Sequence, residues 1–335
     1  MAHLLPFVFS FSLVAALAAQ SDRRREGRNA PVPEIKLEHF VYEEVEMESP
    51  SVRMGVYLPR GHADEASADE RYPWVVWLHG RNESHHKFHR DGGARVLDEL
   101  RGKGEIPELV FVALTLGNPI YVDTGRGVDQ EKLITERLPA FLAEKYRVKN
   151  ERTARAVMGV SMGGFGALKI AMRHPDLFAT VAAHSSALMP ADPESLQPPY
   201  QRQVQRMVER GGLDAVFGNP IDKEKWAQHM PLALAASMDT EELSRLAIYF
   251  DAGTEDRYGF GPPNQKLHEV LKERGVPHEF ELVQGGGHSW GSGSLQKQLV
   301  KSLTFVGKRF VAAEAASTGT AAPAAGDKAS AEAGR

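Results

Sequence analysis

The sequence predicts an α/β fold, with a mostly parallel central sheet, helices on both faces and an N-terminal antiparallel hairpin. Short apolar runs alternate with amphipathic helical patterns from residue 74 to residue 310, which is typical of a parallel sheet covered on both faces. Two earlier segments, 38–48 and 52–58, indicate the hairpin. The composition, 42% hydrophobic and 25% charged, agrees with a globular domain.

The elements follow in order along the chain. After the hairpin we expect strands at 74–78, 109–114, 153–158, 179–184, 246–250 and 278–283. We expect helices at 130–146, 164–173, 263–274 and 294–310. The insertion 189–242 holds several Pro, Met and aromatic residues. We expect it to cap the cleft, a position where substrate specificity usually resides.

The segment 157–164 reads Val-Met-Gly-Val-Ser-Met-Gly-Gly and matches the pattern G-x-S-x-G around Ser161. An apolar run precedes the serine and a helical pattern follows it, so Ser161 would lie in a sharp turn from strand to helix. Such a turn costs about 1–3 kcal/mol of backbone strain, and Gly159 and Gly163 would leave the space that it needs. The turn would lift the Ser161 hydroxyl clear of the sheet, as a nucleophile requires.

A second match to this pattern, at 287–291, centres on Ser289. Where such a turn carries a nucleophile, the acid and then the base follow it along the chain, and no histidine follows His288. Ser161 is therefore the predicted nucleophile. His288 is the predicted base, because three glycines release it from the end of a strand. The other histidines after Ser161 occupy positions typical of structural residues, although His184 could line the cleft: His174, His184, His229, His268 and His278.

The acid is expected in the loop after the strand 246–250, which carries three acidic residues. We favour Asp256, because it lies several residues past the strand and can curl back toward the imidazole. Asp251 and Glu255 are the alternatives, and Asp251 would otherwise fix the loop by accepting hydrogen bonds from backbone N–H groups. The acid would hold the tautomer of the imidazole and stabilise its charged form.

Backbone N–H groups from two places are expected to bind the oxyanion of the reaction. The strand 74–78 is followed by His79-Gly80-Arg81. The N–H of Arg81, paired with that of Met162 at the start of the predicted helix, forms the candidate oxyanion hole. The alternative is that the His-Gly pair merely closes a strand.

A cluster of polar residues follows this loop: His85, His86, His89 and Asp91. Imidazoles and a carboxylate are suitable zinc ligands, but we interpret the cluster as a solvated polar loop at the mouth of the cleft. We expect no metal and no cofactor, since hydrolysis by an activated serine needs neither.

These motifs together resemble the putative-esterase branch of the α/β-hydrolases. That branch includes esterase D, S-formylglutathione hydrolases, feruloyl and acetyl-xylan esterases, enterochelin esterases and mycolyltransferases. The resemblance implies the α/β-hydrolase fold and a triad of Ser161, His288 and Asp256. Arg81 is a departure, because many relatives carry a small or apolar residue there, and its charge would alter substrate choice. The matching segments are 77–80, 159–168, 174–178, 183–186, 253–256 and 287–290.

The resemblance implies a serine carboxylesterase that hydrolyses a carboxylic ester through an acyl-enzyme, with feruloyl or acetyl esters on polysaccharide as the favoured substrates. The alternatives are an S-formylglutathione hydrolase, a short-chain lipid esterase, an acyltransferase of the mycolyltransferase type, and a binding protein without the chemistry. Trp290, beside the predicted base, would form a wall for an aromatic acyl group or else simply pack. A net charge of −4 gives no reason to expect nucleic acid as a partner. The sequence does not predict an oligomeric state.

We divide the chain into four segments. Residues 1–18 are mostly apolar and are expected to be a signal peptide, too short for a stable membrane span of about 20 residues, although a retained anchor is the alternative. Residues 19–35 form a polar lead-in, 36–310 the catalytic domain, and 311–335 an Ala/Gly-rich tail expected to be disordered. The chain has no cysteine and so no disulfide, which fits a secreted or periplasmic bacterial enzyme.

Overall fold

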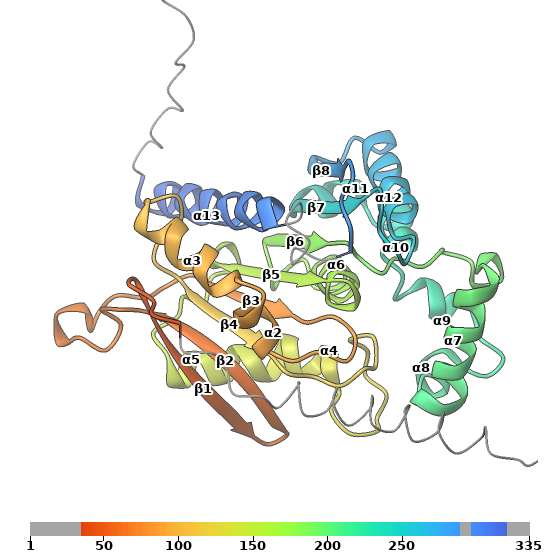
Figure 1. The fold of residues 1–335 in the computed structure, drawn as a ribbon, viewed down its shortest axis with the longest axis horizontal. Coiled ribbons are helices and arrows are strands. Elements are labelled where there is room, and N and C mark those ends of the chain that lie inside the picture. The colour runs from red at the N-terminus through yellow and green to blue at the C-terminus, as the bar shows by residue number, and fades with distance from the viewer. Residues whose placement is uncertain (1–34, 289–295, 320–335) are drawn as a thin grey trace, which may run out of the picture.

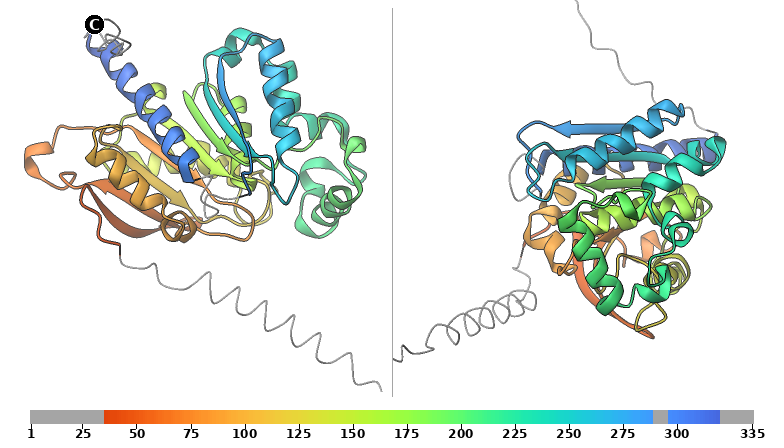
Figure 2. Two further views of the ribbon diagram at one scale, coloured as in Figure 1. Left: turned by 45° about the horizontal axis from the view of Figure 1, so that its top comes forward. Right: turned by 90° about the vertical axis from the view of Figure 1, so that its right-hand side faces the viewer.

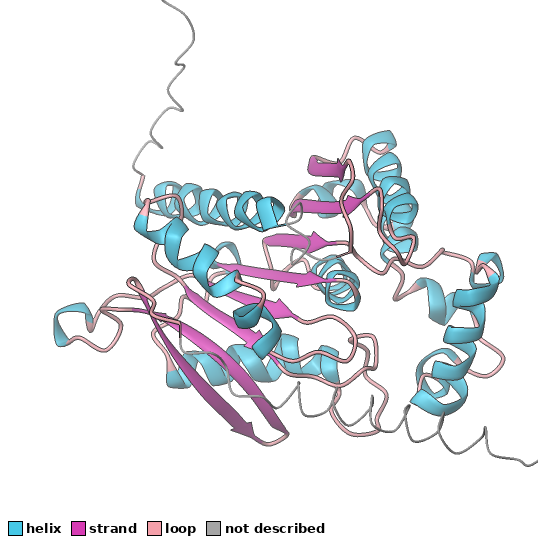
Figure 3. Ribbon diagram, in the orientation of Figure 1, coloured by secondary structure: helices cyan, strands magenta, loops and turns pink. Residues whose placement is uncertain are grey.

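The computed structural model describes residues 35–288 and 296–319, and their arrangement is shown in Figure 1. The predicted signal peptide, almost all of the lead-in, the end of the tail and Trp290 lie outside the described residues. The described residues form the predicted sheet with helices on both faces (Figure 3). Its strands are β1 (Phe40–Glu48), β2 (Ser51–Pro59), β3 (Trp74–Leu78), β4 (Val110–Leu114), β5 (Arg155–Val160), β6 (Thr180–His184), β7 (Ala247–Gly253) and β8 (His278–Val283).

The strands lie in the order β1-β2-β4-β3-β5-β6-β7-β8. β1 and β2 form the predicted antiparallel hairpin, and β2 pairs antiparallel with β4. Every pair from β4 to β8 is parallel. Parallel pairing brings the carboxyl ends of these strands to one edge, where the loops that carry the predicted site residues begin.

The central strands are buried on both faces, because helices cover each side of the sheet. In β3, the side chains of Trp74, Val76 and Leu78 belong to one core, and those of Val75 and Trp77 belong to the other. Helices α3 (Gly93–Gly102) and α13 (Gln296–Thr318) pack against each other over the second core (Figure 2). Helices α5 (Leu138–Lys145), α6 (Met162–Arg173) and α12 (Gly261–Glu273) cover the first core.

The four predicted helices are present. The first of them consists of α4 (Gln130–Lys132), a π-helical turn η2 (Leu133–Arg137) and α5. Helix α3 and the short α2 (His86–Arg90) were not predicted, since glycine is unfavourable inside helices and Gly92 and Gly93 interrupt the pattern. Gly92 precedes α3 in the left-handed conformation, with φ 89°. Short 3₁₀ turns are η1 (Glu65–Ser67), η3 (Arg152–Ala154) and η4 (Pro193–Ser195).

The expectation of a disordered tail from residue 311 is wrong for residues 311–318, which continue α13. Alanine is the strongest helix former, and Ala312, Ala313, Ala315 and Ala316 fall in this stretch. The carboxylate of Glu314 also pairs with Lys149 of the catalytic domain. The biased composition therefore indicated helix propensity as well as disorder. None of the helices in the described part of the chain is both long and apolar enough to span a membrane.

The first three helices of the insertion after β6 form a group beside the carboxyl edge of the sheet (Figure 1), whereas its fourth helix packs against α6 and α12. Trp226 is fully buried within this group, against Phe217. The insertion thus has a small core of its own that continues into the main one. Its helices are α7 (Pro198–Gly211), α8 (Asp214–Phe217), α9 (Lys223–Ala227), α10 (Pro231–Ser237) and α11 (Thr240–Ser244).

Ser161 lies in the predicted sharp turn between β5 and α6. Its φ of 59° and ψ of −117° are values that residues other than glycine rarely adopt. Three backbone hydrogen bonds hold it in this conformation. Its N–H donates to the carbonyl of His184 (2.8 Å), and its carbonyl accepts from the N–H groups of Phe165 (3.0 Å) and Ala187 (2.9 Å).

Two glycines allow the turn because other backbone atoms occupy the space of their missing side chains. A Cβ on Gly163 would lie 1.9 Å from the carbonyl oxygen of Leu78, and one on Gly159 would lie 2.4 Å from the carbonyl oxygen of Gly163. The obstacles are backbone groups of the sheet and of the turn, which cannot rotate away. Gly163 is therefore required by the contact of the turn with β3, and Gly159 is required by a contact within the turn itself.

We predict that Gly163→Ala forces α6 away from β3 and lowers the free energy of unfolding by about 3 kcal/mol or more, at the upper end of typical overpacking costs. Gly211→Ala in α7 is the matched control, because its Cβ would lie 3.7 Å from that of Met207, an ordinary contact. Urea unfolding of both variants checks the expectation. Equal midpoints for the two variants would contradict it.

Candidate active site

Three of the predicted residues are joined by hydrogen bonds at the carboxyl edge of the sheet. The Nε2 atom of His288 lies 3.0 Å from the Oγ of Ser161, and its Nδ1 lies 2.8 Å from the Oδ2 of Asp256. Ser161 comes from the turn after β5, Asp256 from the loop after β7, and His288 from the loop after β8. An ionised carboxylate only accepts hydrogen bonds, so Nδ1–H donates to Asp256 and Nε2 is left to accept the serine proton.

The carboxylate of Asp256 is held in place and shielded from water. Its side chain is 1% exposed. Its Oδ1 accepts a hydrogen bond from the backbone N–H of Tyr258 (2.8 Å), which leaves Oδ2 for His288. The acid therefore fixes both the tautomer and the direction of the imidazole.

The loops that carry the acid and the base are bonded to each other. The N–H of Thr254 donates to the carbonyl of Val283 (3.0 Å), and that of Glu255 donates to the carbonyl of Gly286 (2.8 Å). A Cβ on Gly253 would lie 2.0 Å from the Gly286 carbonyl oxygen, so glycine is needed for this approach. Glu255, one of the alternative acids, supplies its amide to this contact, and its carboxylate makes no bond to His288.

Asp251, the other alternative acid, lies within β7 and not in the loop. It is fully buried, and its Oδ2 lies 2.7 Å from the Nδ1 of His184. The Nε2 of His184 lies 3.0 Å from the Oγ of Ser302 in α13. Asp251 thus binds an imidazole and does not fix the loop through backbone N–H groups, and His184 lies in the core instead of lining the cleft. We call these three residues the buried Ser–His–Asp chain.

The predicted oxyanion donors lie beside Ser161. Arg81 and Met162 both line the cavity into which the Ser161 hydroxyl opens. The amide of Met162 is the first of α6, where helical N–H groups have no partner within the helix. The amide of Arg81 makes no hydrogen bond to another described residue. A Cβ on Gly80 would lie 3.5 Å from the Cβ of Ser161, so the loop passes directly behind the serine.

His79 and Glu83 fix the shape of this loop. The Nε2 of His79 accepts from the N–H of Leu116 (2.9 Å), and its Nδ1 lies 2.6 Å from the carbonyl oxygen of Gly80. Burial lowers the pKa of His79, so the imidazole stays neutral in this role. The carboxylate of Glu83 accepts from the N–H of Gly80 (3.1 Å), and burial raises its pKa. The His-Gly pair therefore holds the loop in position and does more than end β3, which was the alternative interpretation.

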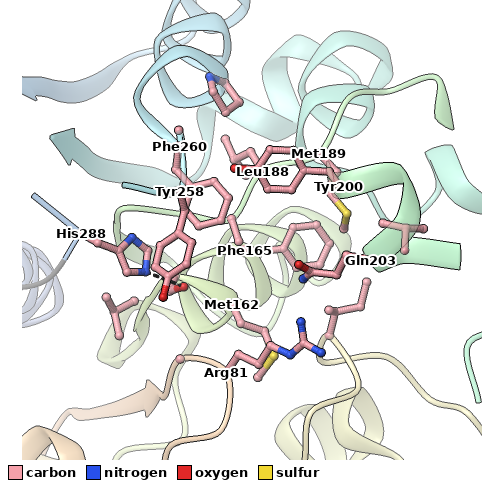
Figure 4. A pocket seen from close by; sticks show the side chains of 18 of the residues that line it. Arg81, Met162, Phe165, Leu188, Met189, Tyr200, Gln203, Tyr258, Phe260 and His288 are labelled. Carbon is pink, nitrogen blue, oxygen red and sulfur yellow. Dashed lines mark hydrogen bonds between the residues drawn. The ribbon is translucent and has the colours of Figure 1, made fainter. Parts of the chain in front are cut away.

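A cavity of about 820 Å³ extends from Ser161 and His288 beneath the inserted helices (Figure 4). Its polar end, at the loop after β3, includes Arg81, Glu83 and Lys87. The remainder is mostly apolar, as is usual for sites that bind small molecules. Residues of the insertion line part of the cavity. The apolar lining of the cavity includes Phe165, Leu188, Met189, Val204, Met207 and Trp226.

Two aromatic side chains that the sequence analysis missed pack against His288 (Figure 4). The ring centroids of Tyr258 and Phe260 lie 4.5 and 5.4 Å from that of the imidazole. Both line the cavity. Both follow Asp256 in the same loop, and this position in the sequence could have indicated that they lie near the site. Trp290, which was predicted to lie beside the base, is outside the described residues.

The interpretation of the histidine cluster as a solvated loop is wrong. His85, His86 and His89 are 2%, 7% and 2% exposed. His86 bonds to Glu44 of β1 (3.0 Å), and His89 bonds to the hydroxyl of Tyr57 in β2 (3.0 Å). The hairpin covers these imidazoles, and its position could not be read from the residues around them.

Sequence comparisons identify the family and relatives of this chain. The sequence model of a family described as "Putative esterase" matches residues 49–306. Esterase Rv1288 of Mycobacterium tuberculosis (strain ATCC 25618 / H37Rv) is 29% identical over 161 residues, which cover 46% of this chain and 34% of that protein. The diacylglycerol acyltransferase/mycolyltransferase Ag85B of Mycobacterium avium is 30% identical over 166 residues, 48% of this chain and 47% of that protein. The chain thus spans about a third to a half of the length of these relatives.

Solved structures share the fold. A ferulic acid esterase superposes with a TM-score of 0.64 at 24% identity, covering 82% of this chain and 100% of that one. An S-formylglutathione hydrolase from Agrobacterium tumefaciens gives a TM-score of 0.62 at 19% identity, covering 82% and 99%. These neighbours show that the fold is the α/β-hydrolase fold that the sequence predicts. Because the family match covers most of the chain, the protein belongs to the putative esterase family.

Proposed function

We propose that the chain is a serine carboxylesterase that hydrolyses a carboxylic ester through an acyl-enzyme on Ser161. The observation that carries this proposal is the bonded series of Ser161, His288 and Asp256, whose serine end opens into a cavity. Nothing in the series needs to move before the serine proton is transferred.

The mechanism follows from the directions of these bonds. As the Ser161 oxygen attacks the acyl carbonyl, the Nε2 of His288 takes its proton, and the buried Asp256 stabilises the imidazolium. The amides of Arg81 and Met162 would bind the oxyanion, a contribution worth about 10²–10³ in turnover for each donor. His288 then protonates the leaving alcohol, and a water activated in the same way releases the acid.

An aromatic acyl group, such as a feruloyl ester on polysaccharide, is the favoured substrate. The cavity is far larger than an acetyl group requires, and Tyr258 and Phe260 offer ring faces beside the base. S-formylglutathione is the second candidate, because Arg81 at the polar end would suit a carboxylate of the leaving group. A short-chain lipid ester is less well supported by this polar end. The proposal includes export of the protein from a bacterial cell, for which the expected signal peptide at residues 1–18 is the support.

Transfer of the acyl group to another alcohol is a further candidate, favoured by the name of the relative Ag85B. Hydrolysis and transfer share the acyl-enzyme and differ only in the acceptor. Incubation of the enzyme and a chromogenic ester with sugar acceptors would separate them, since transfer yields a new sugar ester in place of the free acid.

Ser161→Ala is expected to lower the turnover of p-nitrophenyl acetate by about 10⁴-fold or more, because the nucleophile is lost. It should also abolish labelling by a fluorophosphonate probe while leaving the circular dichroism spectrum unchanged. The matched control is Ser302→Ala, which removes the serine of the buried chain. It should keep both turnover and labelling per folded molecule. Labelling of Ser161→Ala at the wild-type rate would refute the assignment.

Asp256→Asn is expected to present the wrong tautomer of His288 and to lower turnover by up to about 10⁴-fold with the fold intact. Asp251→Asn should do the opposite, costing about 1–3 kcal/mol of stability through its buried bond to His184 with little loss of turnover. Activity and urea unfolding of both variants give the answer. A greater loss of activity for Asp251→Asn at equal folded fraction would show that the acid is misassigned.

Substrate preference can be measured as kcat/KM on methyl ferulate, acetylated xylan, tributyrin and S-formylglutathione. We expect methyl ferulate to be the best of the four, since it alone fills an aromatic acyl pocket. Arg81→Met keeps the backbone N–H and removes the charge, so it should weaken only the activity on S-formylglutathione. A wild-type preference for S-formylglutathione would instead support the second candidate.

A further inference from the structure

Three side chains from distant parts of the chain converge outside the cavity. Glu44 lies on β1, His85 directly before α2, and His86 is the first residue of α2. One ligand atom from each lies within 4.8 Å of the others. The Oε1 of Glu44 is 3.0 Å from the Nε2 of His86 and 3.8 Å from the Nε2 of His85. None of the three lines the cavity described above.

These separations suit a bound divalent ion. Zinc binds histidine nitrogen and carboxylate oxygen at about 2.0–2.2 Å, so the ligands of a tetrahedral ion lie about 3.3–3.5 Å apart. The two separations from Glu44 fall on either side of this value. Small rotations of the Glu44 side chain, which is 48% exposed, would make them equal. Its exposure also leaves room for water as a fourth ligand.

His85 supplies an independent sign that something is bound. Its Nε2 is buried and has no hydrogen-bond partner among the described residues. Its Nδ1 bonds to the Oγ1 of Thr115, which also accepts from the backbone N–H of His85 (2.9 Å). A metal-binding histidine is normally held in this way, with its second nitrogen bonded to a neighbouring polar group. The carboxylate nearest to this nitrogen, that of Glu44, lies 3.8 Å away, which is too far for a hydrogen bond.

The surroundings keep the three side chains in this arrangement. The hydroxyl of Tyr42 donates to the Oε1 of Glu44 (3.2 Å). Gly55 pairs with Glu44 in the hairpin. A Cβ on Gly55 would lie 2.8 Å from the ring of Tyr42 and 3.3 Å from the Cδ2 of His85, so the glycine leaves room for these two side chains.

We infer that Glu44, His85 and His86 bind a divalent transition metal ion of the zinc class. The ion would join β1 of the hairpin to the start of α2, a few residues after the loop that carries Arg81. Its role is therefore structural, and the hydrolytic mechanism does not pass through it. Metal binding would fasten the end of the oxyanion loop to the sheet.

The test is metal binding by the full chain, prepared without a histidine tag and stripped with chelator. We expect calorimetry to show one equivalent of Zn²⁺ bound with micromolar or tighter affinity, and a higher Tm with the metal. Co²⁺ should give the intense visible bands of a four-coordinate ion. Glu44→Gln and His86→Gln should each weaken binding by about 100-fold or more, beyond the 10–100-fold effect usual for a neighbour of a ligand. Both variants must keep the wild-type circular dichroism spectrum.

A further variant serves as a control. His39→Gln removes an exposed histidine near Glu44 in the sequence and should bind the metal as the wild type does. Weak binding by the wild type, or wild-type affinity in the Glu44 and His86 variants, would overturn the inference. Loss of metal binding only when Ser161 is labelled would also overturn it, because the ion would then lie at His288. Loss of metal binding only in His278→Gln would place the ion at the bonded pair His268 and His278 and would overturn it too.

Discussion

The close approach of α6 to β3 is the contact on which the rest of the site depends. Because the carbonyl of Leu78 occupies the space of a side chain on Gly163, the helix starts against the sheet without a spacer. Ser161 must then turn sharply, and its backbone bonds to β6 and to the segment after it keep the strained conformation. The same approach sets the first amide of α6 beside the loop after β3. One steric constraint therefore positions the serine and both predicted oxyanion donors.

The acid and the base depend on a second approach of the same kind, between Gly253 and Gly286. The chemistry is thus fixed by backbone packing at the sheet edge. The insertion contributes part of the apolar lining and none of the bonded series. This division separates the loops that position the bonded series from a large part of the residues that line the cavity. It also explains why the geometry supports ester chemistry more strongly than any one substrate.

Features with local signals could be predicted from the sequence. The elbow is specified by glycines within a few residues of Ser161, and Asp256 by its distance from a strand. Features formed by distant partners could not. Asp251 and His184 are 67 residues apart, and His184 and Ser302 are 118 apart. The burial of His85 likewise depends on a hairpin about forty residues earlier, so its polar neighbours in the sequence were misleading. In 311–318 one composition fitted both helix and disorder.

The buried Ser–His–Asp chain gives the molecule an internal comparison. Its two separations, 2.7 and 3.0 Å, almost equal the 2.8 and 3.0 Å of the series at the sheet edge. A search for hydrolases based on interatomic distances alone would find two sites in one protein. Only one of them has a route for an ester and for water. The proton resonances of His184 and His288, recorded in a single sample, would therefore distinguish the effect of hydrogen-bond geometry on an imidazole from the effect of hydration.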